Sequence, residues 1–597
     1  MNKLRSVKVL GILMIAVAGL IQSCSTGAQR DLSKNEVVIH MLADADMLLP
    51  INSTSANSTY IEGNIFQSLL GRDPETLELV GILAVDRPII EEIDEGEYEG
   101  GMRITYEIRP EARWDNGDPI TAHDVDFTFK AIKNPRVNNE HLKPYMDFIK
   151  EIVIDEENPR LFTLYSDQRY MLAEEFSGYI VLPEYVYDPN GLMRNYSLKQ
   201  LSDLTELEKI RGDRAIIDFA DNFNSERYQR EIGYVVGSGP YEFKGWATGQ
   251  RITLQKKEDW WGDELADRYS WFQANPQRIV YEIINDMTTA VTSLRDQGLD
   301  VIAGLRPRDF INLTDDSRFQ QNFNLYSPIA YSYVYIGMNM RIPKLEDVRV
   351  RKALAHLVDK EQIIEVINYG LAEETIGPIH PTKEYYHDGL RPIDYNVERA
   401  RELLAEAGWK DLTGDGILNK EIDGDMETLR LEFLYNSGND IRRNIGLIFK
   451  ENARRAGVDI DVQVKEWTVF IDLTKSHQFE LFCGGWISGP GLDDPKQIWH
   501  TESSNNGSNY VGFGTEESDM LIDSIRVELD PEVRNQMYRR FQEIVSEEVP
   551  YIFLYTPKNL LAIHSRWDNA EPSILRPGYN ETSFKLKPEF TESSMTQ

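Results

Sequence analysis

An apolar run close to the N-terminus sets the conditions under which this chain has to fold. Basic residues precede an uninterrupted apolar stretch over residues 9–21, and Gln22-Ser23-Cys24 follows it. A membrane-spanning helix needs roughly 20 apolar residues, so this stretch is too short to cross a bilayer. Its order of basic, apolar and small residues is typical of a signal peptide over residues 1–23. The rest of the chain is therefore expected to fold outside the cytoplasm.

The cysteine that follows this apolar run predicts a lipid anchor. Cys24 stands where a lipoprotein signal ends, so we expect cleavage before it and lipidation of its thiol. An ordinary signal peptide beside a chance cysteine stays open, because Gln22 is not among the commoner residues at its position. The expected location is the cell envelope, lipid-anchored in a membrane that faces the periplasm or the exterior. Ser25 leaves the choice between inner and outer membrane open.

The cysteine count constrains the folded part. The chain has two cysteines, Cys24 and Cys483, so lipidation of the first leaves the second without an intramolecular partner. The fold therefore has to be stable without a disulfide. Cys483 lies between Leu481-Phe482 and Gly484-Gly485, which favours a small buried apolar residue over a nucleophile.

Charge and length exclude some classes of protein. The chain has 98 acidic and 64 basic residues, a net charge of -34. A surface this acidic repels nucleic acid and anionic lipid, and neither is expected as a partner. Contact with a membrane is expected through the lipid anchor alone. At 597 residues the chain also exceeds what one hydrophobic core supports, and two or three domains are expected.

Periodicity predicts the first elements. Residues 24–35 are polar and aperiodic, as a tether is, and ordered structure is expected from Glu36 with a buried strand at 37–39. A helix face is expected at 65–70. The polar loop between them, residues 52–59, either faces solvent or lines a ligand site.

Clearer signals follow between residues 102 and 132. Tyr106 and Ile108 alternate with polar neighbours, as in a half-buried strand. Thr121 and Asp124 form a capping box, which predicts a helix whose apolar residues Val125, Phe129 and Ile132 share one face. Residues 185–235 resemble a peripheral insertion of helices and loops. From about residue 287 strands and helices alternate, which favours an α/β domain with a mixed sheet.

The order of these segments resembles the family 5 extracellular solute-binding proteins, the dipeptide and oligopeptide receptors of ABC importers. The match spans nearly the whole chain after the signal peptide, and each of its landmarks alone is a turn, cap or amphipathic face. The landmarks are Ile104 to Arg109, Trp114 to Asp124, Gly237 to Tyr241, Trp260 to Gly262, Asp347 to Leu354 with Asp359-Lys360, Ala400 to Gly408, Ala456 to Val458, Gly485-Trp486 with Asp494-Pro495, and Asn509-Tyr510 with Ser518-Asp519.

The resemblance implies an α/β, two-lobed periplasmic-binding-protein-like fold (type II, cluster C) with an extra subdomain in the first lobe. Residues 36–75, 236–286 and 506–597 are expected in lobe I, residues 76–235 in its subdomain, and residues 287–505 in lobe II. The implied function is capture of a peptide between the lobes for the permease subunits of an ABC transporter. A monomer without a cofactor, a metal or enzymatic activity is expected.

One position departs from the family pattern. Peptide-binding members carry an aspartate three residues after the tryptophan of the Gly-Trp segment, and it holds the amino terminus of the peptide. Here Gly489 stands at that position, or Gly491 when the count starts from Asp494-Pro495. Asp493 is the candidate substitute. Asp494 is a second candidate, with a helix N-cap before Pro495 as its other interpretation.

The missing carboxylate keeps other ligands open. A blocked or cyclic peptide, an oligosaccharide or a cation complex would need no such anchor. The family also implies that the backbone of Gly485, Trp486 and Ile487 pairs with an extended ligand. Trp486 either stacks on the ligand or is a core aromatic. Hydroxyl groups from the opposite lobe would come from the polar loop, at Ser55, Ser58 and Thr59.

Other residue patterns in the sequence fit known sites less well. Asp411 to Asp423 resembles a calcium loop, but Ile422 stands where a bidentate Glu is required, and a simple acidic turn is the alternative. Motifs for a nucleophile elbow, a zinc protease, a phosphate loop and a dinucleotide site are absent from the sequence. A secreted hydrolase with unrecognised carboxylates, and a surface sensor or adhesin, remain as alternatives from other classes.

Overall fold

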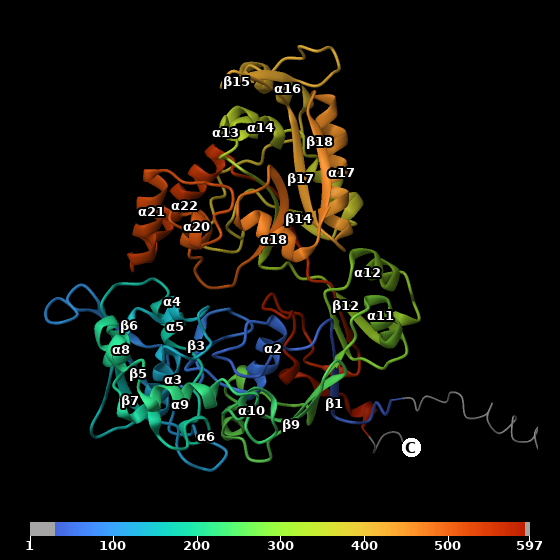
Figure 1. Cartoon of the computed structure of the whole chain (residues 1–597). Helices are drawn as coiled ribbons and strands as arrows, with labels where there is room; N and C mark the ends of the chain where they lie inside the picture. The colour runs from blue at the N-terminus through green and yellow to red at the C-terminus, as the bar shows by residue number, and fades with distance from the viewer. Residues whose placement is uncertain (1–29, 592–597) are drawn as a thin grey trace, which may run out of the picture.

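Two bodies, each built around its own sheet, make up the computed structural model (Figure 1), which describes residues 30–591. The lower body in Figure 1 is called the first lobe and the upper body the second lobe. The expected two-lobed α/β architecture is confirmed. The predicted signal peptide and Cys24 lie outside the described residues.

The first lobe is organised by a seven-stranded mixed sheet. In spatial order its strands are β12 (Phe323–Tyr326), β21 (Leu561–His564), β11 (Val301–Ala303), β1 (Glu36–Met41), β10 (Arg278–Ile283), β9 (Arg251–Lys256) and β8 (Tyr241–Ala247). The strand β1 runs parallel to both of its neighbours, β10 and β11. Such a strand is covered on both faces, which is why Val37, Val38 and Ile39 form one continuous apolar run.

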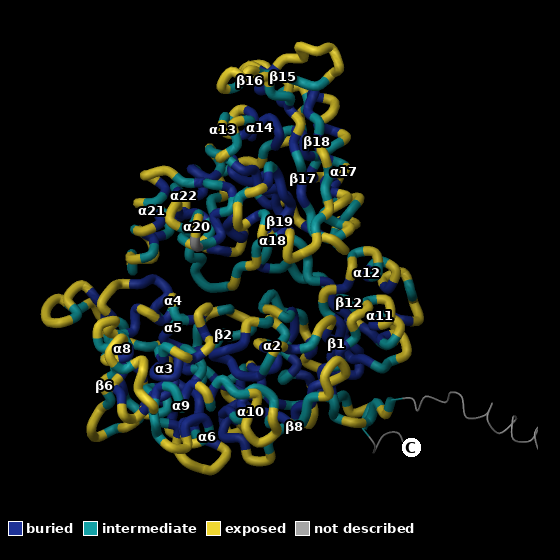
Figure 2. The backbone as a smooth tube through the Cα atoms, viewed as in Figure 1, coloured by how far each residue is buried: buried dark blue, intermediate teal, exposed yellow. Residues whose placement is uncertain are grey.

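Helices cover both faces of β1. On one face Val38 packs in a core with side chains of α11 (Met287–Arg295) and α12 (Pro307–Thr314). On the other face Val37 and Ile39 join a larger core that includes Ile61 and Ile65 of α2 (Ala56–Ile65). Figure 2 shows the buried interior of this lobe. The larger core continues into the second lobe, where it includes Tyr335 and Phe482.

A subdomain extends the first lobe. Its four-stranded sheet has the order β4 (Ile89–Glu92), β5 (Met102–Glu107), β7 (Leu161–Ser166), β6 (Ile149–Ile154). The predicted helix is α3 (Ala122–Lys133), with the capping box of Thr121 and Asp124 present and the predicted apolar face buried. The expected insertion consists of the short helices α6 (Glu184–Tyr187), α7 (Leu198–Ser202), α8 (Leu204–Ile210), α9 (Arg214–Phe223) and α10 (Glu226–Arg230).

The second lobe is built on a six-stranded sheet. The order is β14 (Ala372–Glu374), β20 (Tyr551–Pro557), β13 (Ser332–Met338), β19 (Leu481–Ile487), β17 (Arg430–Asn436), β18 (Asp459–Lys465). Its main helices are α14 (Val348–Ala355), α16 (Val397–Glu406), α17 (Asp440–Arg455), α18 (Trp467–Lys475), α21 (Glu516–Val527) and α22 (Pro531–Glu548). None of the helices in the described range 30–591 is long and apolar enough to cross a membrane.

Two short segments connect the lobes. The chain leaves the first sheet after β12 and enters the second sheet at β13, and it returns from β20 to β21. The outgoing and returning segments pair with each other: Ile329 and Lys558 form an antiparallel bridge, and the Asn559 amide donates to the Pro328 carbonyl at 2.7 Å. This pair of segments is called the hinge.

The hinge corrects the expected domain boundaries. Residues 287–326 carry β11 and β12 of the first sheet, although they were expected in lobe II. Residues 506–557 carry β20 of the second sheet, although they were expected in lobe I. The prediction missed this because the boundary follows strand pairing over long sequence distances, which local periodicity does not encode.

Two local predictions also need correction. The expected tether 24–35 is packed from residue 30 onward: the Arg30 guanidinium donates to Asp300 at 2.6 Å, and the Lys34 carbonyl accepts from Arg566. The expected helix face at 65–70 is instead the end of α2 followed by strand β2 (Leu70–Arg72). Helix α2 begins inside the expected polar loop.

A buried ion cluster holds the two ends of the first lobe together. Asp300 and Arg566 are fully buried and pair at 2.8 Å, and Arg30 adds a second guanidinium. Burial alone would raise the pKa of Asp300, but the two guanidinium groups hold the pKa well below its usual value. The carboxylate is therefore charged in the folded protein at neutral pH.

Replacing Asp300 with asparagine should destabilise the protein by about 3–5 kcal/mol, because Arg566 is left buried without its counter-charge. Urea unfolding measures this loss. A group with a depressed folded pKa stabilises above its unfolded pKa of about 4, so this contribution should be lost as pH falls below about 4. Asp218→Asn, which breaks an exposed pair with Arg214, is the control and should cost about 0.5 kcal/mol or less. Equal losses in both variants would contradict the assignment.

Candidate functional site

A cleft of about 640 Å³ lies between the two lobes. First-lobe segments 72–79 and 170–175 line one wall, and second-lobe segments 382–385, 490–492 and 529–535 line the other. The volume lies within the range typical of small-molecule sites. Figure 1 shows α18 on the side of the second lobe that faces α2.

The strand β19 leads to this cleft and has an unpaired edge. It pairs with β13 along its whole length, from Leu481 to Ile487. With β17 it pairs only at Leu481 and Phe482, within the part of the chain that the structure describes. From Cys483 onward its second edge is free of strand partners there.

Alternation along β19 tells which amides face the free edge. The Ser488 amide donates to the Tyr331 carbonyl, on the β13 side. Because successive residues of a strand point their amides to opposite sides, those of Gly485 and Ile487 point toward the free edge. Both residues are exposed, and Ile487 retains 61% of its surface. An extended chain could therefore add to the sheet at this edge.

The Trp486 side chain lies on the opposite face of the sheet from the Ile487 side chain. Its ring stacks on Tyr510 with 6.1 Å between centroids, and its indole N–H donates to the Tyr551 hydroxyl at 3.4 Å. The side chain is partly buried against the second lobe. These contacts hold the indole ring against the face of the sheet. The ring is therefore only partly exposed.

The first-lobe candidates occupy a helix start. Ser55 caps α2 by accepting from the Asn57 amide, and Thr59 donates to the Ser55 carbonyl at 3.2 Å. Ser58 is fully buried and bonds to Asp46, so its hydroxyl is already used within the lobe. Among the described contacts none joins these three residues to β19, and their role as ligand donors stays a proposal.

The loop after β19 encloses a lysine that sequence reasoning missed. Lys383 donates to the Gly489 carbonyl at 2.5 Å and to the Gly491 carbonyl, and its Nζ lies 3.8 Å from Asp493. The ammonium also lies 5.3 Å from the centroid of the Tyr331 ring. No signal in the sequence pointed to Lys383, because it precedes the loop by more than a hundred residues in an aperiodic segment.

Asp493 is engaged within the protein. The Tyr385 hydroxyl donates to its carboxylate at 3.0 Å, and Lys383 supplies the nearest positive charge. Burial raises the pKa of Asp493 and lowers the pKa of Lys383, and the attraction between them opposes both shifts. Asp493, expected to hold the ligand directly, therefore faces Lys383 in the structure.

Gly491 lies where the two lobes approach each other closely. Arg72 and Glu175 of the first lobe form an ion pair at 2.7 Å, and this pair packs against Gly491. A Cβ atom at position 491 would lie 2.6 Å from Arg72 Nη2 and closer still to Glu175. The ion pair thus occupies the space that an aspartate at 491 would need.

The lobes also touch at the rim opposite the hinge. The Met171 amide donates to the Arg526 carbonyl at 2.8 Å, and the Arg526 guanidinium lies over the Tyr170 ring. Asp494 accepts from Arg526 at 2.9 Å and from the Lys496 amide, which starts α19 (Lys496–Trp499). The second candidate aspartate is thus an ion-pair partner of Arg526 that also accepts from the first amide of α19, whose N-cap residue is Pro495. Because the lobes contact each other at the hinge and at this rim, the structure shows them close together.

A family profile matches this chain over most of its length. The match covers residues 92–509, and the family is described as bacterial extracellular solute-binding proteins, family 5. The chain belongs to this family. The sequence resemblance is thereby confirmed.

Similar proteins cover nearly the whole of this solute-binding protein. The oligopeptide-binding protein AppA of Bacillus subtilis is 27% identical over 587 residues, which are 96% of each chain. The solved structure of AppA in complex with a nonapeptide covers 94% of this chain and 100% of its own, with a TM-score of 0.68 and 23% identity. NikA of Brucella suis, solved in complex with Fe(III)-EDTA, covers 92% of this chain and 100% of its own, with a TM-score of 0.72 and 16% identity.

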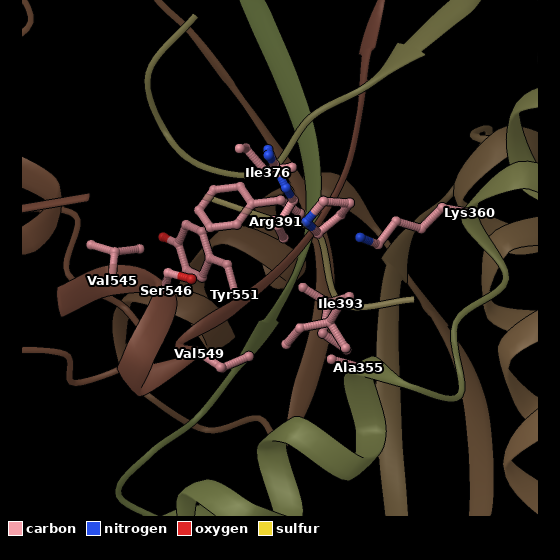
Figure 3. Close-up of a pocket in the computed structure, with 12 residues that line it drawn as sticks. Ala355, Lys360, Ile376, Arg391, Ile393, Val545, Ser546, Val549 and Tyr551 are labelled. Carbon is pink, nitrogen blue, oxygen red and sulfur yellow. The ribbon is translucent and has the colours of Figure 1, made fainter. Parts of the chain in front are cut away.

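A second pocket lies inside the second lobe of this solute-binding protein. Figure 3 shows it between α14, α22 and β20, lined by residues such as Ala355, Ile393 and Val549. Its volume is about 30 Å³, enough for roughly one water molecule. It is too small to hold a solute.

In the acidic loop 411–423, the carboxylates of Asp411 and Asp415 accept hydrogen bonds from backbone amides of the same loop. Asp411 accepts from the amides of Gly414 and Gly416, and Asp415 accepts from the Ile417 amide. These are turn interactions. Within residues 30–591 no group of three or more His, Cys, Asp or Glu side chains is placed to hold a metal ion.

Replacing Gly491 with valine should displace the Arg72–Glu175 ion pair, because the branched side chain needs the space that the ends of these two side chains occupy. A double-mutant cycle of Arg72→Ala and Glu175→Ala in urea unfolding measures the coupling of the pair, and the coupling should be lost in Gly491→Val. Gly489→Val is the matched control, since nothing lies within 4 Å of a Cβ atom at that position. Equal coupling in the two variants would refute the close approach at 491.

Proposed function

We propose that this protein captures peptides between its lobes and passes them unaltered to the permease subunits of an ABC importer. The free edge of β19, next to the loop 490–492 that lines the cleft, carries the proposal. The amides of Gly485 and Ile487 offer main-chain pairing to any extended peptide, whatever its side chains. A site of this kind gives affinity with little dependence on sequence.

The relatives support a peptide as the solute. Besides AppA, the oligopeptide-binding protein OppA of Bacillus subtilis is 23% identical over 507 residues, 81% of this chain. A solute other than a peptide is the second candidate. It is favoured by the engagement of Asp493 with Lys383, and relatives include a heme-binding protein A of Haemophilus influenzae, matched over 53% of this chain.

The two-lobed geometry supports a transport role without chemistry. A solute that contacts both lobes stabilises the closed arrangement, and a membrane partner can distinguish that arrangement from the empty one. The hinge gives the lobes two short connections about which to move. In this proposal a lipid on Cys24 keeps the protein at the membrane that holds the importer, facing the periplasm or the exterior.

Replacing Ile487 with proline should weaken peptide binding, because it removes the amide donor at the free edge. One hydrogen bond contributes about 0.5–1.5 kcal/mol, so the loss in affinity should be up to roughly tenfold. Isothermal titration with a series of tri- to nonapeptides measures it. Ile487→Ala keeps the amide and is the control. Equal affinities in the two variants would argue against strand addition, and cleaved peptide in the titrated sample would argue for a hydrolase.

Replacing Cys24 with serine should release the protein from the membrane, because the acylated thiol is lost. Fractionation of the expressing cells, followed by immunoblotting, measures the release. Cys483→Ser is the control and should stay with the membrane, since Cys483 is buried in the second lobe. A membrane-bound Cys24→Ser protein would rule out lipid anchoring through this residue.

A further inference from the structure

The loop after β19 and its neighbours form a seat for an ammonium group. Three oxygen acceptors converge there: the carbonyls of Gly489 and Gly491 and the carboxylate of Asp493. Two aromatic rings, of Tyr331 and Tyr385, lie 5.3 and 5.9 Å from the same point. Acceptors and ring faces together attract a cation. These five residues are called the ammonium seat.

The seat is occupied by the protein itself. The Lys383 ammonium lies within it, and the Lys383 side chain is only 4% exposed. The two carbonyls and the Asp493 carboxylate around its Nζ are all acceptors, which favours the charged form of the lysine. Lys383 thus already fills the ammonium seat before a solute binds.

The lysine is held in place by the segment that carries it. The Gln542 amide of α22 donates to the Tyr385 carbonyl at 2.7 Å and accepts from the His387 amide at 3.1 Å. The Tyr385 ring stacks on Tyr538, also of α22, with 4.1 Å between centroids. Lys383 itself lies outside any helix or strand, and the backbone that carries it is anchored to α22 through these neighbours.

A second cation lies next to the seat. Arg72 of the first lobe is close enough to repel Lys383, and with Glu175 it closes over Gly491. An incoming amino terminus would find the seat already filled by Lys383 and, beside it, an Arg72 guanidinium whose charge is paired with Glu175. Burying an ammonium without a partner is costly.

We infer that Lys383 permanently takes the place of a solute's amino group, so that the peptides captured here are amino-blocked or cyclic. The inference rests on the proposed peptide function and specifies its substrate class. It assigns Asp493 a positioning role: this carboxylate holds Lys383 and does not touch the solute.

The first test compares two peptides that differ only by an amino-terminal acetyl group. By isothermal titration, the wild-type protein should bind the acetylated peptide at least about tenfold more tightly. Lys383→Ala empties the seat, so the free-amine peptide should gain and the preference should disappear or invert. A lysine that merely braced the loop would change both affinities alike. Tighter binding of the free-amine peptide by the wild type would overturn the inference, and that result needs no variant to fold.

The second test uses no peptide. Propylammonium matches the three carbons and the ammonium that Lys383→Ala removes, so it should raise the thermal midpoint of Lys383→Ala by several degrees over an equal concentration of sodium chloride. The wild type and Lys383→Met, whose seat is still filled by a side chain, should not respond. Lack of selective rescue would overturn the seat. If neither peptide binds the wild type, the peptide function fails, whereas rescue would still establish the seat.

Discussion

The hinge is the constraint on which the rest of the molecule depends. Its two segments are bonded to each other through Ile329 and Lys558, and the two sheets share no strand. Each sheet therefore belongs to one lobe alone, although one hydrophobic cluster extends across both lobes, and the two hinge segments are where the lobes can rotate against each other. A cleft on one side of such a hinge opens and closes as a unit. The binding surface is divided between two rigid bodies for this reason.

The site combines a general surface with a specific one. The free edge of β19 offers backbone groups that any extended chain can use. The loop that follows it is tightly organised around Lys383, and Gly491 lets the first lobe approach it closely. In the proposed function, affinity and selectivity would thus come from a strand and the loop that follows it. At position 491 the missing aspartate fits the same packing, because the Arg72–Glu175 pair fills the space beside Gly491, whereas at position 489 nothing lies within 4 Å of a Cβ atom.

Sequence reasoning succeeded where structure is local. The capping box at Thr121 predicted α3, and the run at 37–39 predicted β1, because hydrogen bonds and burial there involve near neighbours or a whole strand. It failed where distant segments meet. Ser58 was expected in a loop but lies buried on α2, bonded to Asp46, and nothing in the segment around Lys383 indicated that its ammonium meets residues 489–493. Such contacts follow from the fold and leave no periodic trace.

The first lobe is assembled from both ends of the chain, and this affects the order in which the protein can fold. Its sheet combines β1 with β21, and Asp300 acquires its main partner, Arg566, only from the last part of the chain. A nascent polypeptide that stops short of Arg566 carries a carboxylate it cannot bury without a large penalty. The second lobe is complete once β20 has emerged, so it can form first. The first lobe can be completed only afterwards, because both its sheet and its ion cluster need residues 561–566 from the last part of the chain.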